Sequence, residues 1–200
     1  MCADHNKGVP LASPLNGTVY WITGLPGSGK STFARTLTKC LHESGRKALL
    51  MDADDIRRAL GNAFGFGRED RRKVGAIYGR LALIISKQGY DVALATVSMF
   101  EDLRRWNRCN LPIYKEIYIQ TPADIIVHRH PHGLYARALQ QRVRNVPGVD
   151  QYIEEPINPD FIIRNDASMS PERFGDLAHK ILKIHLLHNS PATITYTSHG

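Results

Sequence analysis

The chain has 200 residues, of which 42% are hydrophobic and 22% charged, and its formal net charge at pH 7 is +7. A chain of this length and composition is typical of one soluble globular domain with a real core. Because it shows neither an apolar run of bilayer length nor a signal-peptide pattern at its start, we expect a cytoplasmic location and no membrane partner.

Three segments are expected along the chain. The first 17 residues are rich in Gly, Pro, Asn and Ser, and they are predicted to form a flexible N-terminal arm, residues 1–17. Residues 18–188 carry the alternating pattern of a folded domain. The Ser/Thr-rich end, residues 189–200, is predicted to be a C-terminal tail.

Within the domain, strands and helices are expected to alternate. Apolar runs predict five strands, at residues 19–22, 47–51, 92–96, 116–119 and 161–163. Helical periodicity lies between them, most clearly from Glu69 to Gln88, and a closing helix is expected from Pro171 to His188. This order predicts an α/β fold with a five-stranded parallel sheet and helices on both faces. Its ligand crevice is expected beyond the carboxyl ends of the strands.

A long polar stretch, residues 129–156, interrupts this alternation. A segment of that length inside a compact α/β domain is more often a functional lid than a slack loop. We therefore predict a lid that covers the ligand crevice.

Residues 24–32 read G-L-P-G-S-G-K-S-T and fit the phosphate-binding loop G-x-x-x-x-G-K-[ST] of P-loop NTPases. They follow an expected strand and open an expected helix, where such a loop aims backbone N–H groups at phosphate oxygens. Lys30 is expected to reach the terminal phosphates, and Ser31 is expected to hold Mg²⁺. The predicted nucleoside triphosphate site comprises Gly24, Gly27, Ser28, Gly29, Lys30, Ser31 and Thr32.

A second polar cluster follows the second expected strand. Asp52, Asp54 and Arg57 come at the carboxyl end of that strand. There a carboxylate can accept a hydroxyl proton or help hold Mg²⁺, and an arginine can bind an anionic acceptor. Asp residues are also common at helix N-termini for structural reasons alone, which is the alternative explanation. The position after the second strand favours the catalytic interpretation.

The positive charge is spread along the chain, with small clusters at residues 57–58, 71–73 and 104–105. The aromatic interleaving typical of RNA-binding segments is missing. A basic cleft for small phosphorylated ligands therefore explains the charge better than a nucleic-acid partner does.

The order of the motifs resembles the adenylyl-sulfate (APS) kinase family. That family runs G-L-S-G-A-G-K-S-T, D-G-D-N-x-R, G-F-S-x-x-D-R-x-E-N-x-R-R, I-S-P-Y-R, R-D-P-K-G-L-Y and T-G-I-D-D-P-Y-E-x-P. The corresponding segments of this chain are residues 24–32, 52–57, 65–71, 97–101, 129–135 and 147–150. The resemblance covers residues 18–165 without an obvious gap.

The resemblance implies an ATP-dependent kinase that uses Mg²⁺ and transfers the γ-phosphoryl group to a ribose 3′-hydroxyl of an anionic nucleotide. By carry-over, Asp54 would be the general base, Lys30 would contact the phosphates and Asp52 would lie near Mg²⁺. Arg129 would pack on the adenine of ATP. The acceptor would be bound by Asp54, Arg57, Phe66, Arg71, Ser98 and Arg137. The resemblance also leaves room for a homodimer.

The departures from the family pattern lie on the acceptor side. The family's E-N-x-R-R becomes K-V-G-A-I at residues 73–77, and its S-P-Y-R becomes S-M-F-E at residues 98–101. Neutral drift at peripheral positions and a changed acceptor are the two explanations, and both stay open. Some relatives of APS kinases phosphorylate cytidine diphosphoramidate, so the acceptor is either adenylyl sulfate or a diverged nucleotide of that kind.

Two other classes of protein stay open. A different small-molecule kinase, for a sugar acid or an antibiotic, would not need the family's lid motifs at residues 133–135 and 147–150. A non-catalytic nucleotide-binding module is disfavoured by the intact phosphate loop and aspartates. The alternating residues His128, His130 and His132 overlie the lid motif without a cysteine or carboxylate at ligand spacing, so no metal site is expected there.

Overall fold

The structure is a computed structural model that describes residues 16–61, 63–129, 133–166, 169–187 and 194–196. Nearly all of the expected N-terminal arm therefore lies outside the described residues. The same is true of His130 and His132, and of the expected C-terminal tail apart from residues 194–196.

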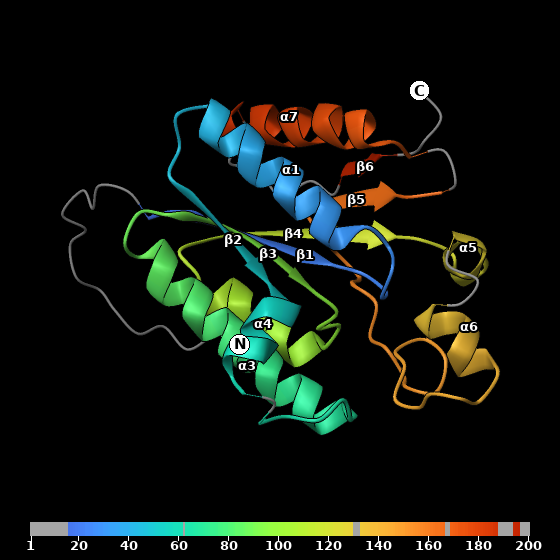
Figure 1. Ribbon diagram of the computed structural model, residues 1–200. Helices are drawn as coiled ribbons and strands as arrows, with labels where there is room; N and C mark the ends of the chain where they lie inside the picture. The colour runs from blue at the N-terminus through green and yellow to red at the C-terminus, as the bar shows by residue number, and fades with distance from the viewer. Residues whose placement is uncertain (1–15, 62, 130–132, 167–168, 188–193, 197–200) are drawn as a thin grey trace.

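A six-stranded parallel sheet forms the centre of the molecule, with strand order β2-β3-β1-β4-β5-β6 (Figure 1). Its strands are β1 (Thr18–Thr23), β2 (Ala48–Asp52), β3 (Asp91–Thr96), β4 (Ile113–Gln120), β5 (Phe161–Arg164) and β6 (Ile194–Tyr196). The helices are α1 (Lys30–Glu43), α2 (Ala53–Ala59), α3 (Arg68–Ser86), α4 (Glu101–Asn110), α5 (Ala123–Arg129), α6 (Leu134–Leu139) and α7 (Pro171–Leu187).

The predicted α/β fold with a parallel sheet is confirmed, and the five predicted strands are β1 to β5. The number of strands needs one correction, because β6 adds a sixth strand beside β5 within the segment that was expected to be tail. Its sequence, Ile-Thr-Tyr, has the β-branched and aromatic residues that favour strands, but three residues are too few for a clear alternating pattern.

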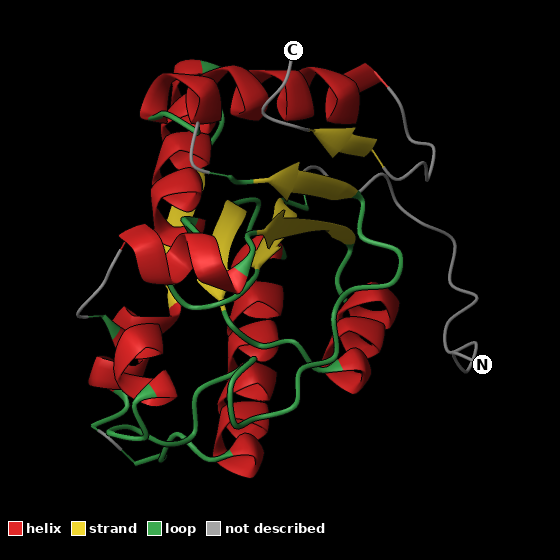
Figure 2. Cartoon of the chain, turned by 90° about the vertical axis from the view of Figure 1, so that its right-hand side faces the viewer, coloured by secondary structure: helices red, strands yellow, loops and turns green. Residues whose placement is uncertain are grey.

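Helices cover both faces of the sheet because successive residues of a strand point to opposite sides. On β1, Tyr20 and Ile22 belong to a core shared with α1 and α7, whereas Val19 and Trp21 belong to a core shared with α3. In Figures 1 and 2, α7 accordingly lies on one side of the sheet and α3 on the other.

The site is positioned by the way the chain crosses the sheet. β1 lies in the middle, the chain moves from it to β2 and β3 on one side, and it then crosses to β4 and β5 on the other. At such a switch point the loops that leave the carboxyl ends of the strands diverge and leave room for a ligand. The phosphate loop follows β1 at this point.

The expected lid lies beyond this edge of the sheet and contains α6. Tyr135 and Ala138 of α6 pack with Ile126 of α5 and with Val146 in a small core of their own. No helix among the described residues has both the length and the apolar character that a membrane span requires.

Candidate functional site

The phosphate loop needs glycine at two tightly packed positions. Gly24 has φ +152°, and a Cβ there would lie 2.4 Å from the carbonyl oxygen of Ile119. Gly29 has φ +96°, and a Cβ there would lie 2.8 Å from Nδ2 of Asn165. Both backbone conformations are ones that side-chain-bearing residues avoid, so the loop's shape depends on these two glycines.

Lys30, the first residue of α1, lies inside this loop. Its side chain is buried, and Nζ donates a hydrogen bond of 2.7 Å to the carbonyl oxygen of Leu25. Burial lowers the pKa of Lys30 to about 8, while the nearby charges of Asp54 and Asp52 oppose that change. The ammonium group is thus desolvated and placed within the electrostatic reach of both predicted carboxylates.

Asn165, which directly follows β5, hydrogen-bonds to the phosphate loop. Its Nδ2 donates to the carbonyl oxygen of Ser28 at 2.7 Å, and its Oδ1 accepts from Arg129 at 3.0 Å. Arg129 is therefore linked to the phosphate loop through one side chain. Sequence reasoning missed Asn165, although its position directly after β5 was a usable signal, since polar residues at strand ends face the crevice.

Ser31 and Asp52 offer oxygen atoms at the same edge of the sheet. Asp52 ends β2 and caps α2, and its Oδ1 accepts a hydrogen bond of 3.0 Å from the backbone N–H of Asp54. It is buried, and its charge acts on Lys30. A hydroxyl group and a carboxylate are hard oxygen donors of the kind that Mg²⁺ prefers, so this donor set fits the ion.

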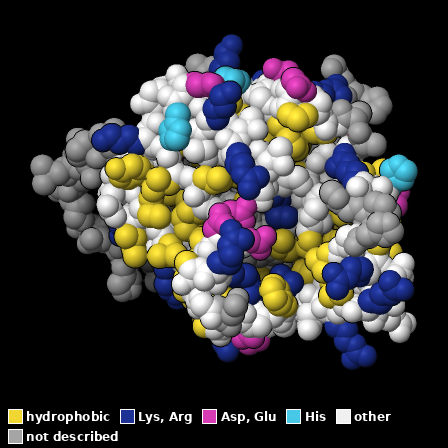
Figure 3. All heavy atoms as spheres, viewed as in Figure 1, with side chains coloured by type: hydrophobic (Ala, Val, Ile, Leu, Met, Phe, Trp, Pro, Cys, Tyr) yellow, Lys and Arg dark blue, Asp and Glu magenta, His cyan; other side chains and the backbone are white. Residues whose placement is uncertain are grey.

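A small cavity of about 50 Å³ lies between α2, α3 and the end of β3. It is lined by Ala53, Asp54, Arg57, Phe66, Arg71, Tyr78, Thr96, Val97 and Ser98. Five of the six predicted acceptor residues therefore line one cavity. On the face of the molecule that Figure 3 shows, acidic side chains lie at the centre with Lys and Arg side chains around them.

The cavity carries a paired positive charge around one aromatic ring. The guanidinium carbon of Arg57 lies 4.9 Å from the ring centroid of Phe66, and that of Arg71 lies 5.4 Å from it. Burial, and secondly the charge of Arg57, lower the pKa of Arg71. Two cations so close to each other favour an anionic ligand between them.

Arg137 and Tyr78 depart from the sequence-based expectations. Arg137 lies on α6 with an exposed side chain and is not among the residues that line the cavity. Tyr78 does line it, and its hydroxyl donates to the carbonyl oxygen of Ala53 at 3.1 Å. Tyr78 shares the core-facing side of α3 with Val74, so periodicity alone indicated only packing.

The positions that depart from the APS kinase pattern do not line the cavity. Val74 is fully buried in the core beneath α3, and Ala76 faces a separate groove between α3 and α4. Glu101 forms an ion pair of 2.7 Å with Arg104. The carboxylate of Glu101 is therefore held by an arginine on its own helix.

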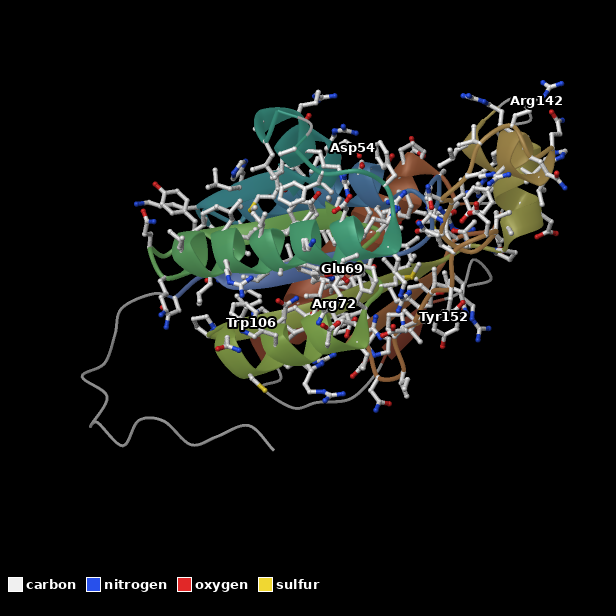
Figure 4. The ribbon with its side chains drawn as sticks, turned by 90° about the horizontal axis from the view of Figure 1, so that it is seen from below. Asp54, Glu69, Arg72, Trp106, Arg142 and Tyr152 are labelled. Atoms are coloured by element: carbon white, nitrogen blue, oxygen red, sulfur yellow. The ribbon has the colours of Figure 1, made fainter. Side chains whose placement is uncertain are left out.

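The second half of the lid is hydrogen-bonded to the acceptor side. Arg71 Nη2 donates to the carbonyl oxygen of Asn145 at 3.2 Å, and Gln151 Nε2 donates to that of Phe66 at 3.0 Å. Arg68, which begins α3, donates to the carbonyl oxygen of Tyr152 at 2.7 Å. We call the segment of the lid that starts at Asn145 and makes these hydrogen bonds the strap. Figure 4 shows Tyr152 of the strap beside the start of α3, with Asp54 beyond that helix.

Known proteins are similar to this chain in sequence and in fold. The sequence model of the adenylylsulphate kinase family matches residues 16–164. The chain is 34% identical to an adenylyl-sulfate kinase of Chloroflexus aurantiacus, over 81% of this chain and 87% of the relative. It is 32% identical to the cytidine diphosphoramidate kinase of Campylobacter jejuni, over 84% of this chain and 98% of the relative.

Solved structures agree with this assignment. The APS kinase CysC of Mycobacterium tuberculosis, in complex with AMPPNP and APS, superposes with a TM-score of 0.76 at 28% identity. The match covers 86% of this chain and 99% of that structure. The chain therefore belongs to the adenylylsulphate kinase family and is an ATP-dependent phosphotransferase.

Proposed function

We propose that this kinase transfers the γ-phosphoryl group of ATP to the ribose 3′-hydroxyl of an anionic nucleotide bound in the cavity between α2 and α3. The position of Asp54 carries the proposal. Asp54 lines the cavity, and its charge also acts on Lys30 in the phosphate loop. The carboxylate of Asp54 thus lies close to both the proposed acceptor site and the proposed phosphate site of ATP.

The roles follow from this placement. The phosphate loop and Lys30 hold the β- and γ-phosphates and offset the charge that builds up during transfer. Asp54 accepts the proton of the attacking hydroxyl. Arg57 and Arg71 bind the anionic part of the acceptor, and the ring of Phe66, which is 60% exposed, offers a stacking surface for its base.

Ser31 and Asp52 would hold Mg²⁺, which would offset the negative charge of the phosphates. Arg129 would pack on the adenine of ATP, and its link to the phosphate loop through Asn165 supports that role. For Arg137 the proposal requires movement of α6, since its side chain lies away from the cavity. A homodimer and a cytoplasmic location also stay predictions.

For the acceptor we propose a nucleotide whose terminal group differs from the sulfate of adenylyl sulfate. Where the family pattern has an arginine, this chain has Glu101, which Arg104 holds outside the cavity lining. In this chain that position therefore supplies no cation to an acceptor. A hydrogen bond to a charged group is worth about 1.5–3 kcal/mol. Cytidine diphosphoramidate, the substrate named for the Campylobacter relative, has such a terminal group.

We expect kcat/KM for cytidine diphosphoramidate to exceed that for adenylyl sulfate by about 10- to 100-fold, which corresponds to one charged hydrogen bond. The measurement is a coupled assay of both acceptors under one set of conditions, with gluconate as a sugar-acid control. Efficient turnover of adenylyl sulfate with an inert cytidine compound would contradict the changed acceptor. Turnover of gluconate alone would contradict the nucleotide kinase itself.

The affinity for ATP is expected to fall as the pH rises above about 8, which is the pKa of Lys30 in the free protein. The phosphates of ATP raise this pKa, so binding above pH 8 must take up a proton and weakens by up to about tenfold per pH unit. Below pH 8 the lysine is already protonated, and this dependence disappears. Calorimetric titration checks this, with Lys30→Arg as the control that stays charged. An affinity that does not change across pH 8 would contradict it.

The lid is expected to protect its exposed turn only when both substrates are bound. Arg142 and Arg144 are exposed trypsin sites between α6 and the hydrogen-bonded strap that starts at Asn145. Closure over ATP and acceptor excludes water and should slow cleavage there. Limited trypsinolysis followed by mass spectrometry, with each ligand alone as the control, measures this. Equal resistance of the free protein would rule out such gating.

A further inference from the structure

α1 and α7 pack side by side on the face of the sheet opposite α3 (Figure 1). Cys40 and Glu43 lie on the last turn of α1, and His179 lies near the middle of α7. One ligand atom from each of the three side chains lies within 4.8 Å of the others. In the described part of the chain, this is the one group of three His, Cys, Asp or Glu side chains that comes so close together.

The distance between the cysteine and the histidine suits a tetrahedral ion, since Cys40 Sγ lies 3.6 Å from Nδ1 of His179. Oε2 of Glu43 lies 3.9 Å from the other ring nitrogen, Nε2, so the Glu43 side chain must turn to reach an ion on Nδ1. In tetrahedral zinc sites the Zn–S distance is about 2.3 Å and the Zn–N distance about 2.0–2.1 Å, so the S and N atoms are about 3.6 Å apart. The cysteine and the histidine therefore already have the spacing of two ligands of one ion.

We propose that Cys40, His179 and Glu43 form a binding site for a thiophilic divalent cation of the Zn²⁺ class, which joins α1 to α7. A thiolate, an imidazole and a carboxylate are all zinc ligands, and a water molecule completes the tetrahedron. The thiolate distinguishes this site from that of Mg²⁺, which prefers oxygen donors.

The exposure of the three side chains fits an open site of this kind. Cys40 is buried at its floor, whereas the side chains of His179 and Glu43 are 62% and 51% exposed. Glu43 also lies 3.7 Å from Lys39 and can leave that exposed ion pair by a change of rotamer. His179 must release its Nδ1 from the carbonyl oxygen of Gly175, at 3.0 Å, when that nitrogen takes the ion.

A cysteine binds such an ion as the thiolate, so binding displaces the thiol proton of Cys40. The ion would also hold together the two helices that pack against the phosphate loop. Phe174 of α7 packs edge-on against Phe33 of α1, with ring centroids 5.5 Å apart. The same Phe174 ring lies 3.2 Å from where a Cβ of Gly29 would be.

The test is a titration of the reduced, chelator-treated protein with Co²⁺ and then Zn²⁺, without ATP. We expect a thiolate-to-cobalt charge-transfer band that saturates at one equivalent and disappears when Zn²⁺ displaces Co²⁺. At a free Zn²⁺ concentration of 100 times Kd, the unfolding equilibrium should shift about 100-fold toward the native state.

Three variants and one control make the test specific. Cys40→Ser should abolish the band, and His179→Gln and Glu43→Gln, which change exposed side chains, should each weaken binding at least about 10-fold. The control is His42→Gln, since His42 is an exposed residue of the same helical turn whose ring is hydrogen-bonded to the carbonyl oxygen of Ala48. This variant should bind Co²⁺ and Zn²⁺ like the parent protein. No band in the parent protein, or a band that survives in Cys40→Ser, would overturn the proposal. Full affinity in both glutamine variants would overturn it as well.

Discussion

Lys30→Ala is expected to abolish phosphoryl transfer while the protein stays folded. The lysine supplies the positive charge that the phosphate loop directs at the β- and γ-phosphates. Loss of one such preorganised electrostatic contact lowers kcat by at least about 10²–10³-fold. The fold should survive because burial already disfavours the charged side chain, as its lowered pKa of about 8 shows.

Steady-state assays and thermal unfolding of Lys30→Ala together check this expectation. Lys39→Ala is the matched control, since Lys39 lies on the same helix with a side chain that is 77% exposed. The control should keep the parent activity. Equal turnover by Lys30→Ala and the parent protein would defeat the assignment of the phosphate loop.

Asp54→Asn is expected to lower kcat by about 10²–10⁴-fold with little change in the affinity for ATP. The amide keeps the size of the side chain but cannot accept the proton of the attacking hydroxyl. The helix itself should be unaffected, because Asp52 rather than Asp54 caps α2 with its side chain.

Single-turnover kinetics and ATP titrations of Asp54→Asn separate the two effects. Asp55→Asn is a close control, because Asp55 is exposed, pairs with Arg58 and does not line the cavity. A loss that appears only as weaker ATP binding would make Asp54 a metal-side residue instead of the base.

Much of the fold could be predicted from sequence because its signals are local. Buried parallel strands read as short apolar runs, and the glycines of residues 24–29 mark the turn between β1 and α1. The cavity was predictable for a related reason, since Asp54 and Ser98 come just after the ends of neighbouring strands β2 and β3. Parallel strands bring such residues to one edge.

The features that the sequence did not reveal depend on tertiary contacts. Whether Glu101 faces the cavity depends on Arg104, which is itself buried against Glu116 at 3.4 Å. In the sequence Tyr78 has the spacing of an ordinary core residue. Only the tertiary structure shows that its hydroxyl donates to the carbonyl oxygen of Ala53 in α2. The direction of Arg137 follows from the packing of α6 against α5, which no local pattern encodes.

The central claim is that the phosphoryl group goes to a ribose 3′-hydroxyl, and the identity of the product tests it most directly. The protein, ATP, Mg²⁺ and the better of the two nucleotide acceptors are incubated together, and the product is examined by mass spectrometry and by ³¹P NMR with proton coupling. One added phosphoryl group, coupled to the ribose H3′ proton, is the predicted result. A phosphoryl group on the 2′-hydroxyl or on the terminal group, or hydrolysis of ATP without any transfer, would contradict the claim.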